Sequence, residues 1–168
     1  MRLFFSIVYI AAVGVLAHFI GEALPRRWFH PERAPYAPRA FERDGRLYRA
    51  LRVQDWKDKL PDMSKISSRM VGKRVSLTGS AEEARRVAVE TCVAEVVHLA
   101  LIPLAIPVYL ICPTGLGLAV AIVYGLSNLP FIIIQRYNRP TLVTLVERLK
   151  QREERIKHAH TDTIGKHR

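Results

Sequence analysis

The sequence predicts an all-α integral membrane protein with three transmembrane helices and additional interfacial helices on the cytoplasmic side. Nearly all apolar residues fall in three blocks, at residues 3–24, 87–112 and 115–134, and nearly all charges lie outside them. Each block supplies roughly the 20 residues that an α-helix needs to cross a bilayer. At 168 residues the chain is short enough to form one domain, so we expect a single membrane domain.

The charge of the chain favours a membrane surface over nucleic acid as its partner. The formal net charge is +11, which fits either an anionic inner leaflet or a nucleic acid. The sequence contains no zinc pattern, helix-turn-helix or aromatic–basic RNA motif. Cys92 and Cys112 fall on one helical segment that holds them far apart, so no disulfide is predicted. We expect contact with anionic lipid and none with nucleic acid.

The first block, residues 3–24, is expected to be an uncleaved anchor. A secretory signal is the alternative, because Val15-Leu16-Ala17 loosely resembles a cleavage site. Only Arg2 precedes the block, whereas Arg26, Arg27 and further arginines follow it closely. Cationic flanks stay in the cytoplasm. The asymmetry therefore places the N-terminus outside the cell membrane.

The second and third blocks are predicted to form a helical hairpin. An uncharged turn at residues 113–115 joins them. The loop at residues 25–86 carries 16 Lys or Arg, and the tail at residues 135–168 carries nine. This distribution predicts a multi-pass protein whose loop and C-terminus are cytoplasmic.

The cytoplasmic segments are expected to contain surface structure. Residues 25–38 are proline-rich and predict an irregular strap. Residues 41–60 predict an amphipathic surface helix, and residues 141–157 a second one. Ser80 is a predicted N-cap for a helix that continues into the second span. If residues 41–60 are helical, their apolar side comprises Leu47, Leu51 and Trp56.

A polar stripe on the second span is the first candidate for chemistry. Thr91, Glu95 and His98 share one helical face, and ionisable side chains in hydrocarbon are costly. His98 would act as a general base with Glu95 orienting its ring. An interhelical packing seam is the structural alternative. A metal site would need further ligands, for which the first span offers only His18 and Glu22; we expect no metal.

The third span supplies a matching polar face. Tyr124, Asn128 and Gln135 lie along it, and an antiparallel hairpin sets Asn128 at the depth of His98. Pro130 is expected to kink the helix nearby. At its end lies the motif Gln135-Arg136-Tyr137-Asn138-Arg139-Pro140. Its guanidinium groups and Asn138 predict recognition of donor phosphates, supported by Lys57 and the arginines at 46, 49 and 52, or alternatively contact with lipid headgroups.

At these residues the chain resembles the glycosyl-4,4'-diaponeurosporenoate acyltransferases, a family of small bacterial membrane enzymes. The resemblance rests on Arg52-Val53-x-x-Trp56-Lys57-x-Lys59, Ala94-Glu95-x-x-His98, Asn128-x-Pro130 and the motif at residues 135–140. It extends from about Phe41 to Glu154. It implies esterification of the sugar of a glycosylated carotenoid, or a similar membrane glycolipid, with a fatty acyl chain, as in staphyloxanthin-type pigments.

For this reaction we infer the following roles for the candidate residues. His98, Glu95 and Asn128 would be catalytic, and either Asn128 or Tyr124 would stabilise the oxyanion. Acyl-CoA would be the co-substrate, with no cofactor. Because three spans hardly enclose a site for two substrates, a homodimer is one way to complete it. Substrate contacts are expected from Tyr124, Trp56, Lys57, Gln135, Arg136, Tyr137, Asn138 and Arg139.

Two other function classes fit the same pattern. A small membrane subunit without activity would use its polar seam to dock a larger partner and its basic surface to bind anionic lipid. A different lipid-modifying enzyme, such as a prenyl- or methyltransferase, would share the topology and use another donor.

Overall fold

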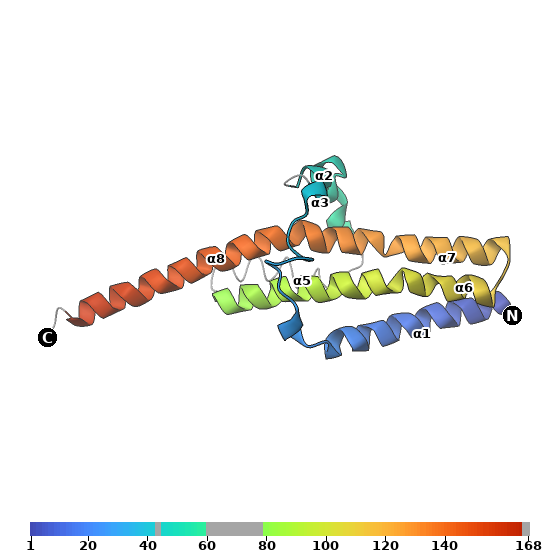
Figure 1. Cartoon of the computed structure of the whole chain (residues 1–168), viewed down its shortest axis with the longest axis horizontal. Coiled ribbons are helices and arrows are strands. Elements are labelled where there is room, and N and C mark those ends of the chain that lie inside the picture. The colour runs from blue at the N-terminus through green and yellow to red at the C-terminus, as the bar shows by residue number, and fades with distance from the viewer. Residues whose placement is uncertain (43–44, 60–78, 166–168) are drawn as a thin grey trace.

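Three long helical rods lie side by side in the computed structural model, which describes residues 1–42, 45–59 and 79–165 (Figure 1). The first rod is α1 (Arg2–Ala23), and the second comprises α5 (Ala81–Leu101), η4 (Pro103–Ala105) and α6 (Ile106–Ile111). The third comprises α7 (Gly115–Ser127) and α8 (Leu129–Gly165). Each rod contains a helix long and apolar enough to cross a membrane. The described residues contain no strand, so the predicted fold class is confirmed.

Helix α1 packs against the middle rod through small and polar contacts. A Cβ added to Gly21 would lie 3.1 Å from a methyl group of Val97, so the two helices approach closely there. Nearer the N-terminus, Ser6 Oγ donates to the carbonyl of Val108 at 3.3 Å and Tyr9 Oη to that of Leu104 at 3.2 Å. Most of the remaining α1 surface is exposed apolar side chain, as expected of a helix that faces lipid.

The middle rod begins where the sequence predicts it. Ser80 Oγ accepts a hydrogen bond from the amide of Glu83 at 3.2 Å, which makes it the expected N-cap of α5. Proline lacks the amide that continues an α-helix. Pro103 accordingly marks a switch to the 3₁₀ segment η4, and the rod resumes as α6. The C-terminal part of this rod is therefore not one continuous α-helix.

The turn between the second and third rods is tight, as predicted for a hairpin. Thr114 caps α7 by accepting a hydrogen bond from the amide of Gly117 at 3.2 Å. A Cβ on Gly117 would lie 1.8 Å from the carbonyl oxygen of Cys112, so this position has room only for glycine. The turn thus fixes the register in which α6 and α7 run back along each other.

The third rod breaks at Asn128, two residues before Pro130, where the sequence predicts a kink. The expectation of a separate surface helix at residues 141–157 is wrong, because α8 continues through Pro140 to Gly165. Packing against α5 holds the helix together across the proline: Ala81 and Ala84 lie in one core cluster with Val146 and Leu149 of α8. Beyond this cluster α8 projects past the other helices (Figure 1).

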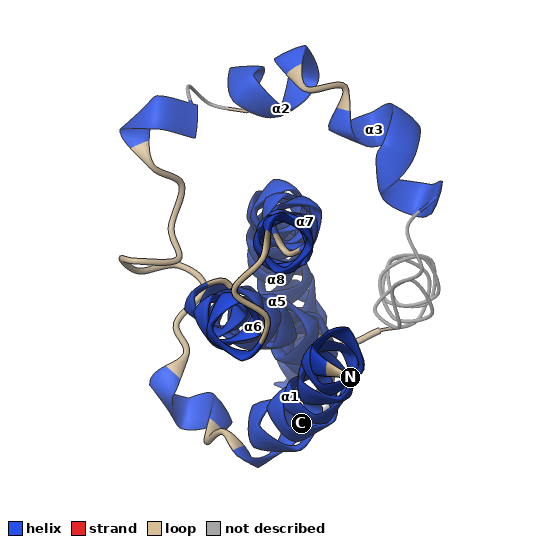
Figure 2. Ribbon diagram, turned by 90° about the vertical axis from the view of Figure 1, so that its right-hand side faces the viewer, coloured by secondary structure: helices blue, strands red, loops and turns tan. Residues whose placement is uncertain are grey.

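After α1 the described part of the chain passes along one side of the bundle, and its short helices, such as α2 and α3, then arch over α7 and α8 (Figure 2). A strap without long helices spans residues 25–42. The predicted surface helix at residues 41–60 is broken into short pieces, because Gly45 and Arg52 have left-handed backbone angles, with φ of 81° and 51°. Among its described residues the buried apolar side chains are Tyr48 and Val53, whereas Leu51 is exposed. The pieces are η2 (Ala40–Glu42), α2 (Arg46–Ala50), α3 (Val53–Trp56) and η3 (Lys57–Lys59).

Several predicted features cannot be compared with the structure. Residues 43–44, 60–78 and 166–168, parts of the predicted loop and tail, lie outside the described residues.

The first strap residues form the 3₁₀ turn η1 (Arg26–Trp28), in which the Arg26 guanidinium pairs with Glu90 of α5 at 2.9 Å. Phe29 is buried with Val89 and Cys92, so the strap is anchored to α5 by apolar contacts as well.

Candidate active site

A histidine–asparagine pair joins α5 to the break between α7 and α8. His98 Nδ1 lies 3.0 Å from Asn128 Oδ1, and Asn128 Nδ2 donates to the carbonyl of Tyr124 at 2.8 Å. The second bond fixes which way the amide points, because only its nitrogen can donate to a carbonyl. Oδ1 therefore faces the imidazole, and Nδ1 must be the donor. The predicted equal depth of His98 and Asn128 is confirmed.

This arrangement sets the tautomer of the histidine. A neutral imidazole has one N–H donor and one acceptor nitrogen. With the proton on Nδ1, the lone pair is on Nε2 of His98, which has no hydrogen-bond partner among the described residues. The ring also stacks on Phe131, with centroids 4.7 Å apart and planes 7° apart. Two contacts thus hold the ring still and leave its basic nitrogen available.

A buried charge cluster lies about one helical turn away on the same helices. Glu95 Oε1 accepts from Arg136 Nη1 at 2.8 Å, and Oε2 pairs with Arg139 Nη2 at 2.6 Å, an ion pair without hydrogen-bond geometry. Arg136 Nε also donates to Glu42 of the strap. All four side chains are at least nine-tenths buried. Two carboxylates balance two guanidinium groups, as burial of charge requires.

The remaining donors of the two arginines go to carbonyl and hydroxyl oxygens. Arg136 contacts the strap carbonyls of Pro35 at 3.4 Å and Ala37 at 3.3 Å. Arg139 donates to the hydroxyl of Thr91 at 2.8 Å, to its carbonyl at 2.9 Å and to the carbonyl of Tyr36 at 3.0 Å. The charge cluster of Glu42, Glu95, Arg136 and Arg139 therefore fastens the strap onto α5 and α8.

Two sequence expectations need correction here. Glu95 does not orient His98, because both of its oxygens are engaged by Arg136 and Arg139. Asn128 takes that place instead. The two arginines are not an exposed anion site either, since their exposed fractions are 7% and 1% and each guanidinium already pairs with Glu95. A guanidinium at this depth needs its carboxylate partner, because a buried charge left unpaired is strongly destabilising.

Three further predicted contact residues, Trp56, Lys57 and Tyr137, lie where the short helices α3 and η3 meet α8. Lys57 Nζ lies over the ring of Tyr137, 4.8 Å from its centroid, and the Tyr137 hydroxyl donates to Gln54 Oε1 at 2.6 Å. Trp56 Nε1 donates to the carbonyl of Leu51 at 2.9 Å, which secures α3. Lys57 and Tyr137 thus come together as a partly exposed surface, with Trp56 beside Lys57 in the chain.

The remaining predicted positions are partly or fully enclosed. Gln135 is 3% exposed and lies on the α8 face that Asn128 and Arg139 share. Tyr124 Oη is buried without a hydrogen-bond partner in the described part of the chain. Asn138 is half-buried. His18 and Glu22, the metal alternative, pair with each other at 3.4 Å on the exposed side of α1, 65% exposed each. The described residues contain no group of three metal-ligating side chains.

An apolar groove of about 520 Å³ runs between the C-terminal part of the second rod and α7. Tyr109 has the only polar side chain among the residues that line it. The groove begins at Ile102 and Leu129, which are close in sequence to His98 and Asn128 respectively. Hydrocarbon therefore has a defined path that starts beside the histidine–asparagine pair.

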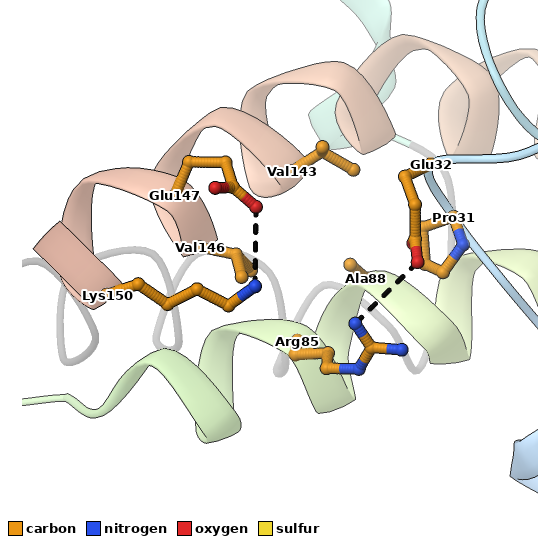
Figure 3. A pocket seen from close by; sticks show the side chains of 8 residues that line it. All are labelled: Pro31, Glu32, Arg85, Ala88, Val143, Val146, Glu147 and Lys150. Carbon is orange, nitrogen blue, oxygen red and sulfur yellow. Dashed lines mark hydrogen bonds and ion pairs between the residues drawn. The ribbon is translucent and has the colours of Figure 1, made fainter.

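A second, much smaller pocket lies between the strap, α5 and α8 (Figure 3). Its volume is about 70 Å³. Arg85 pairs with Glu32 at 3.7 Å and Lys150 with Glu147 at 3.4 Å, as the dashed lines show. Each cation at this pocket has a carboxylate beside it. The pocket is therefore a structural seam between the strap and the helices, and its half-exposed pairs add little stability.

The charge at the strap also affects a tyrosine that the sequence does not single out. Burial, followed by a hydrogen bond to the Glu42 carboxylate, raises the pKa of Tyr48 well above that of a free phenol. Tyr48 also packs edge-to-face on Tyr137, with centroids 5.9 Å apart. The Tyr48 hydroxyl therefore remains protonated and supports the same carboxylate that binds Arg136.

Comparison with known proteins shows the family to which the chain belongs. A profile of the glycosyl-4,4'-diaponeurosporenoate acyltransferases matches residues 25–148, a range that includes the strap, the charge cluster and the histidine–asparagine pair. The chain belongs to this family. Two relatives of that name, from Staphylococcus aureus strains bovine RF122 / ET3-1 and MRSA252, are each 29% identical to the chain over 157 residues, 90% of this chain and 92% of the relative. No solved structure matches the chain.

Membership of the glycosyl-4,4'-diaponeurosporenoate acyltransferase family confirms the expected enzyme class, an acyltransferase. It favours an enzyme over a docking subunit, and acyl transfer over the other lipid modifications. The family match covers α5 and α7 whole and all the short helices from η2 to η3. Both polar groups described above lie within it.

The sequence alone did not indicate two of the partners that matter most. Glu42 stands among arginines in a segment that looks like an ordinary charged surface, and nothing local marks it as buried. Phe131 follows Pro130 in an apolar run and looks like a lipid-facing residue. Its position three residues after Asn128, on a neighbouring helical face, is the signal that would have placed it near His98.

Proposed function

We propose that this protein transfers a fatty acyl group from a soluble acyl thioester, acyl-CoA, to a sugar hydroxyl of a glycosylated carotenoid or similar glycolipid at the cytoplasmic membrane surface. The orientation of the His98–Asn128 pair carries the proposal, because it leaves Nε2 of His98 as an unengaged base. The family name supports the reaction class and the acceptor. The positive residues of the loop and tail support a cytoplasmic position for this end of the bundle.

In the proposed reaction His98 removes the proton from the sugar hydroxyl. The oxygen attacks the thioester carbonyl carbon and forms a tetrahedral intermediate. The C–S bond then breaks, and the imidazolium returns its proton to the departing thiolate, giving an ester and a free thiol. Base catalysis of this kind contributes roughly 10²- to 10⁴-fold to the rate.

The negative charge on the carbonyl oxygen needs a donor. The Asn128 amide nitrogen is already bonded to the Tyr124 carbonyl, so Asn128 is better suited to hold His98 than to stabilise the oxyanion. We assign that role to the Tyr124 hydroxyl, one turn further along the same helical face. It is buried without a partner among the described residues, and such groups usually bind something.

The two substrates would reach the site from different sides. The acceptor's apolar part would stay in the surrounding lipid, with its sugar at His98. The soluble donor would approach across the arch, where Lys57, beside Trp56 and over Tyr137, offers a cation for its phosphates. In this proposal Glu95, Arg136 and Arg139 act indirectly, by holding the strap against the helices.

The test is acyl transfer by purified protein in lipid vesicles that contain a glycosylated carotenoid, with acyl-CoA added and the ester measured by mass spectrometry. We expect His98→Ala to lower the turnover by about 100-fold or more, with an unchanged melting temperature. Leu99→Ala, at an exposed position on the same helix, is the control and should retain activity. Full turnover by His98→Ala protein would refute the assignment of the base.

A further inference from the structure

We infer that the apolar groove between α6 and α7 holds the acyl chain of the donor and that its depth sets the accepted chain length. The inference rests on the proposed acyl transfer. It adds the place where the chain lies and the residues that measure it, neither of which follows from the reaction itself.

The groove begins where the reaction would occur. Ile102 follows His98 by one helical turn, and Leu129 is adjacent to Asn128. It ends at Tyr109 and Leu118, near the turn between the two rods. A chain whose carbonyl carbon lies at His98 would therefore extend toward the opposite end of the bundle.

The length of the groove suits a medium-length fatty acyl chain. From Leu129 to Leu118 the helix rises by roughly 16 Å at 1.5 Å per residue. An extended hydrocarbon advances by about 1.3 Å per carbon, given C–C bonds of about 1.5 Å, so roughly 12 carbons fill the groove. A membrane-spanning polyene would need most of the ~30 Å hydrocarbon thickness. The shorter, flexible chain fits better.

The walls of the groove have the chemistry and shape for a flexible chain. Small residues form its floor: a Cβ added to Gly125 would lie 3.6 Å from the Cβ of Ala105, so the rods nearly touch there. Exposed aliphatic side chains, including Ile106 and Leu126, border it. The joint at Pro103 makes one wall bend. A saturated chain can follow such a bend by rotation about single bonds, whereas a conjugated polyene is stiff.

Ala121 is the position that best tests the inference. It is 7% exposed, lines the groove and lies about 12 Å from Leu129 along the helix, at the depth of roughly the ninth carbon. A phenylalanine at this position would obstruct long chains and leave room for short ones. Tyr109 closes the far end, so removing its ring would make room for additional carbons.

The experiment compares octanoyl, dodecanoyl and octadecanoyl thioesters of CoA with the protein in vesicles. We expect Ala121→Phe to lower the dodecanoyl-to-octanoyl rate ratio by about tenfold or more, and Tyr109→Ala to raise the relative rate with octadecanoyl-CoA several-fold. Val123→Phe is the matched control, because Val123 is 67% exposed on α7 and does not line the groove. It should leave both ratios unchanged.

A binding measurement separates this inference from the proposed function. An acyl-CoA with a photoreactive diazirine at the end of a dodecanoyl chain should label peptides containing Tyr109 or Leu118, and Ala121→Phe should suppress that label. Labelling without turnover by any donor would refute the proposed function and retain the groove. Unchanged chain-length ratios in both variants, or labelling confined to α1, would overturn the inference. An altered preference for the carotenoid acceptor alone would assign the groove to the acceptor and also overturn it.

Discussion

The charge cluster and the histidine–asparagine pair lie about one turn apart between the same two helices, and they differ in how fully their polar atoms are used. In the cluster every carboxylate faces a guanidinium, and the remaining arginine donors meet oxygens of the strap and Thr91. In the pair, Asn128 is fully engaged, but one nitrogen of His98 is not. Similar residue types thus have different roles.

The difference shows how to separate architecture from reactivity within a membrane. A buried charge with all its partners in place is stable only as a set and has nothing left to offer a substrate. A fixed ring with one open lone pair still has an acceptor nitrogen to offer. Whether a polar group in an apolar helix has all its hydrogen-bond and ion-pair partners therefore says more about its role than its presence there.

The largest expected effect breaks the cluster. Glu95→Ala leaves Arg139 buried without a carboxylate, which should lower the free energy of unfolding by about 3–5 kcal/mol. Thermal and denaturant unfolding of the detergent-solubilised protein measure this loss. Glu22→Ala, at a 65% exposed position, is the control and should be nearly neutral.

A double variant sharpens the same point. Because Glu95→Ala and Arg139→Ala remove partners of one pair, the double variant should be less destabilised than the sum of the single variants. Strict additivity would mean that the two side chains act independently and would contradict the cluster. So would a stable Glu95→Ala protein that has lost turnover alone, since that result would return Glu95 to the catalytic group.

A smaller effect, on turnover, is expected when the histidine–asparagine pair is changed. Asn128→Leu removes the acceptor that fixes the tautomer of His98, so turnover should fall by roughly 10- to 100-fold while the apparent affinity for acyl-CoA changes little. Asn128→Asp keeps an acceptor oxygen for Nδ1 and should restore most of the rate. Equal losses in both variants would show that Asn128 matters for packing at the helix break and not for positioning the ring.

The smallest effect, on stability, is expected at Tyr48, which lies beside Glu42 of the charge cluster. The pKa of Tyr48 is raised in the folded state, so the folded protein retains this proton when the unfolded chain begins to lose it near a pKa of 10.0. Its contribution is complete below that value and declines as the pH rises further. Tyr48→Phe should cost about 1 kcal/mol at neutral pH. The difference from wild type should shrink in unfolding measurements at about pH 10–11. A difference independent of pH would contradict the hydrogen bond to Glu42.

Much of the architecture was predictable because it follows from local patterns. Three apolar blocks, the cap at Ser80, the turn before Gly115 and the kink near Pro130 each depend on nearby residues. The equal depth of His98 and Asn128 followed from counting along an antiparallel hairpin. The continuity of α8 through Pro140 did not, because packing against α5 outweighs the local preference of proline.

The partners within the candidate site were harder to predict. A polar stripe on one helix predicts that Thr91, Glu95 and His98 face the same way, and they do face α8. It does not say which partner each meets, because that depends on the exact rotation of the neighbouring helix and on the strap. Glu42 is 94 residues from Arg136 in the chain, and no periodicity relates positions so distant.

The sharing of charge between α5 and α8 has a consequence for how the protein enters the membrane during its synthesis. Glu95 emerges 41 residues ahead of Arg136, and an ionised carboxylate or guanidinium costs about 2.5–3.5 kcal/mol at the centre of a bilayer when it enters alone. The charges cancel only when both helices are present. The second and third rods, which the turn before Gly115 joins, are therefore expected to leave the insertion machinery together as one unit. A ribosome stalled after α6 should leave α5 poorly inserted.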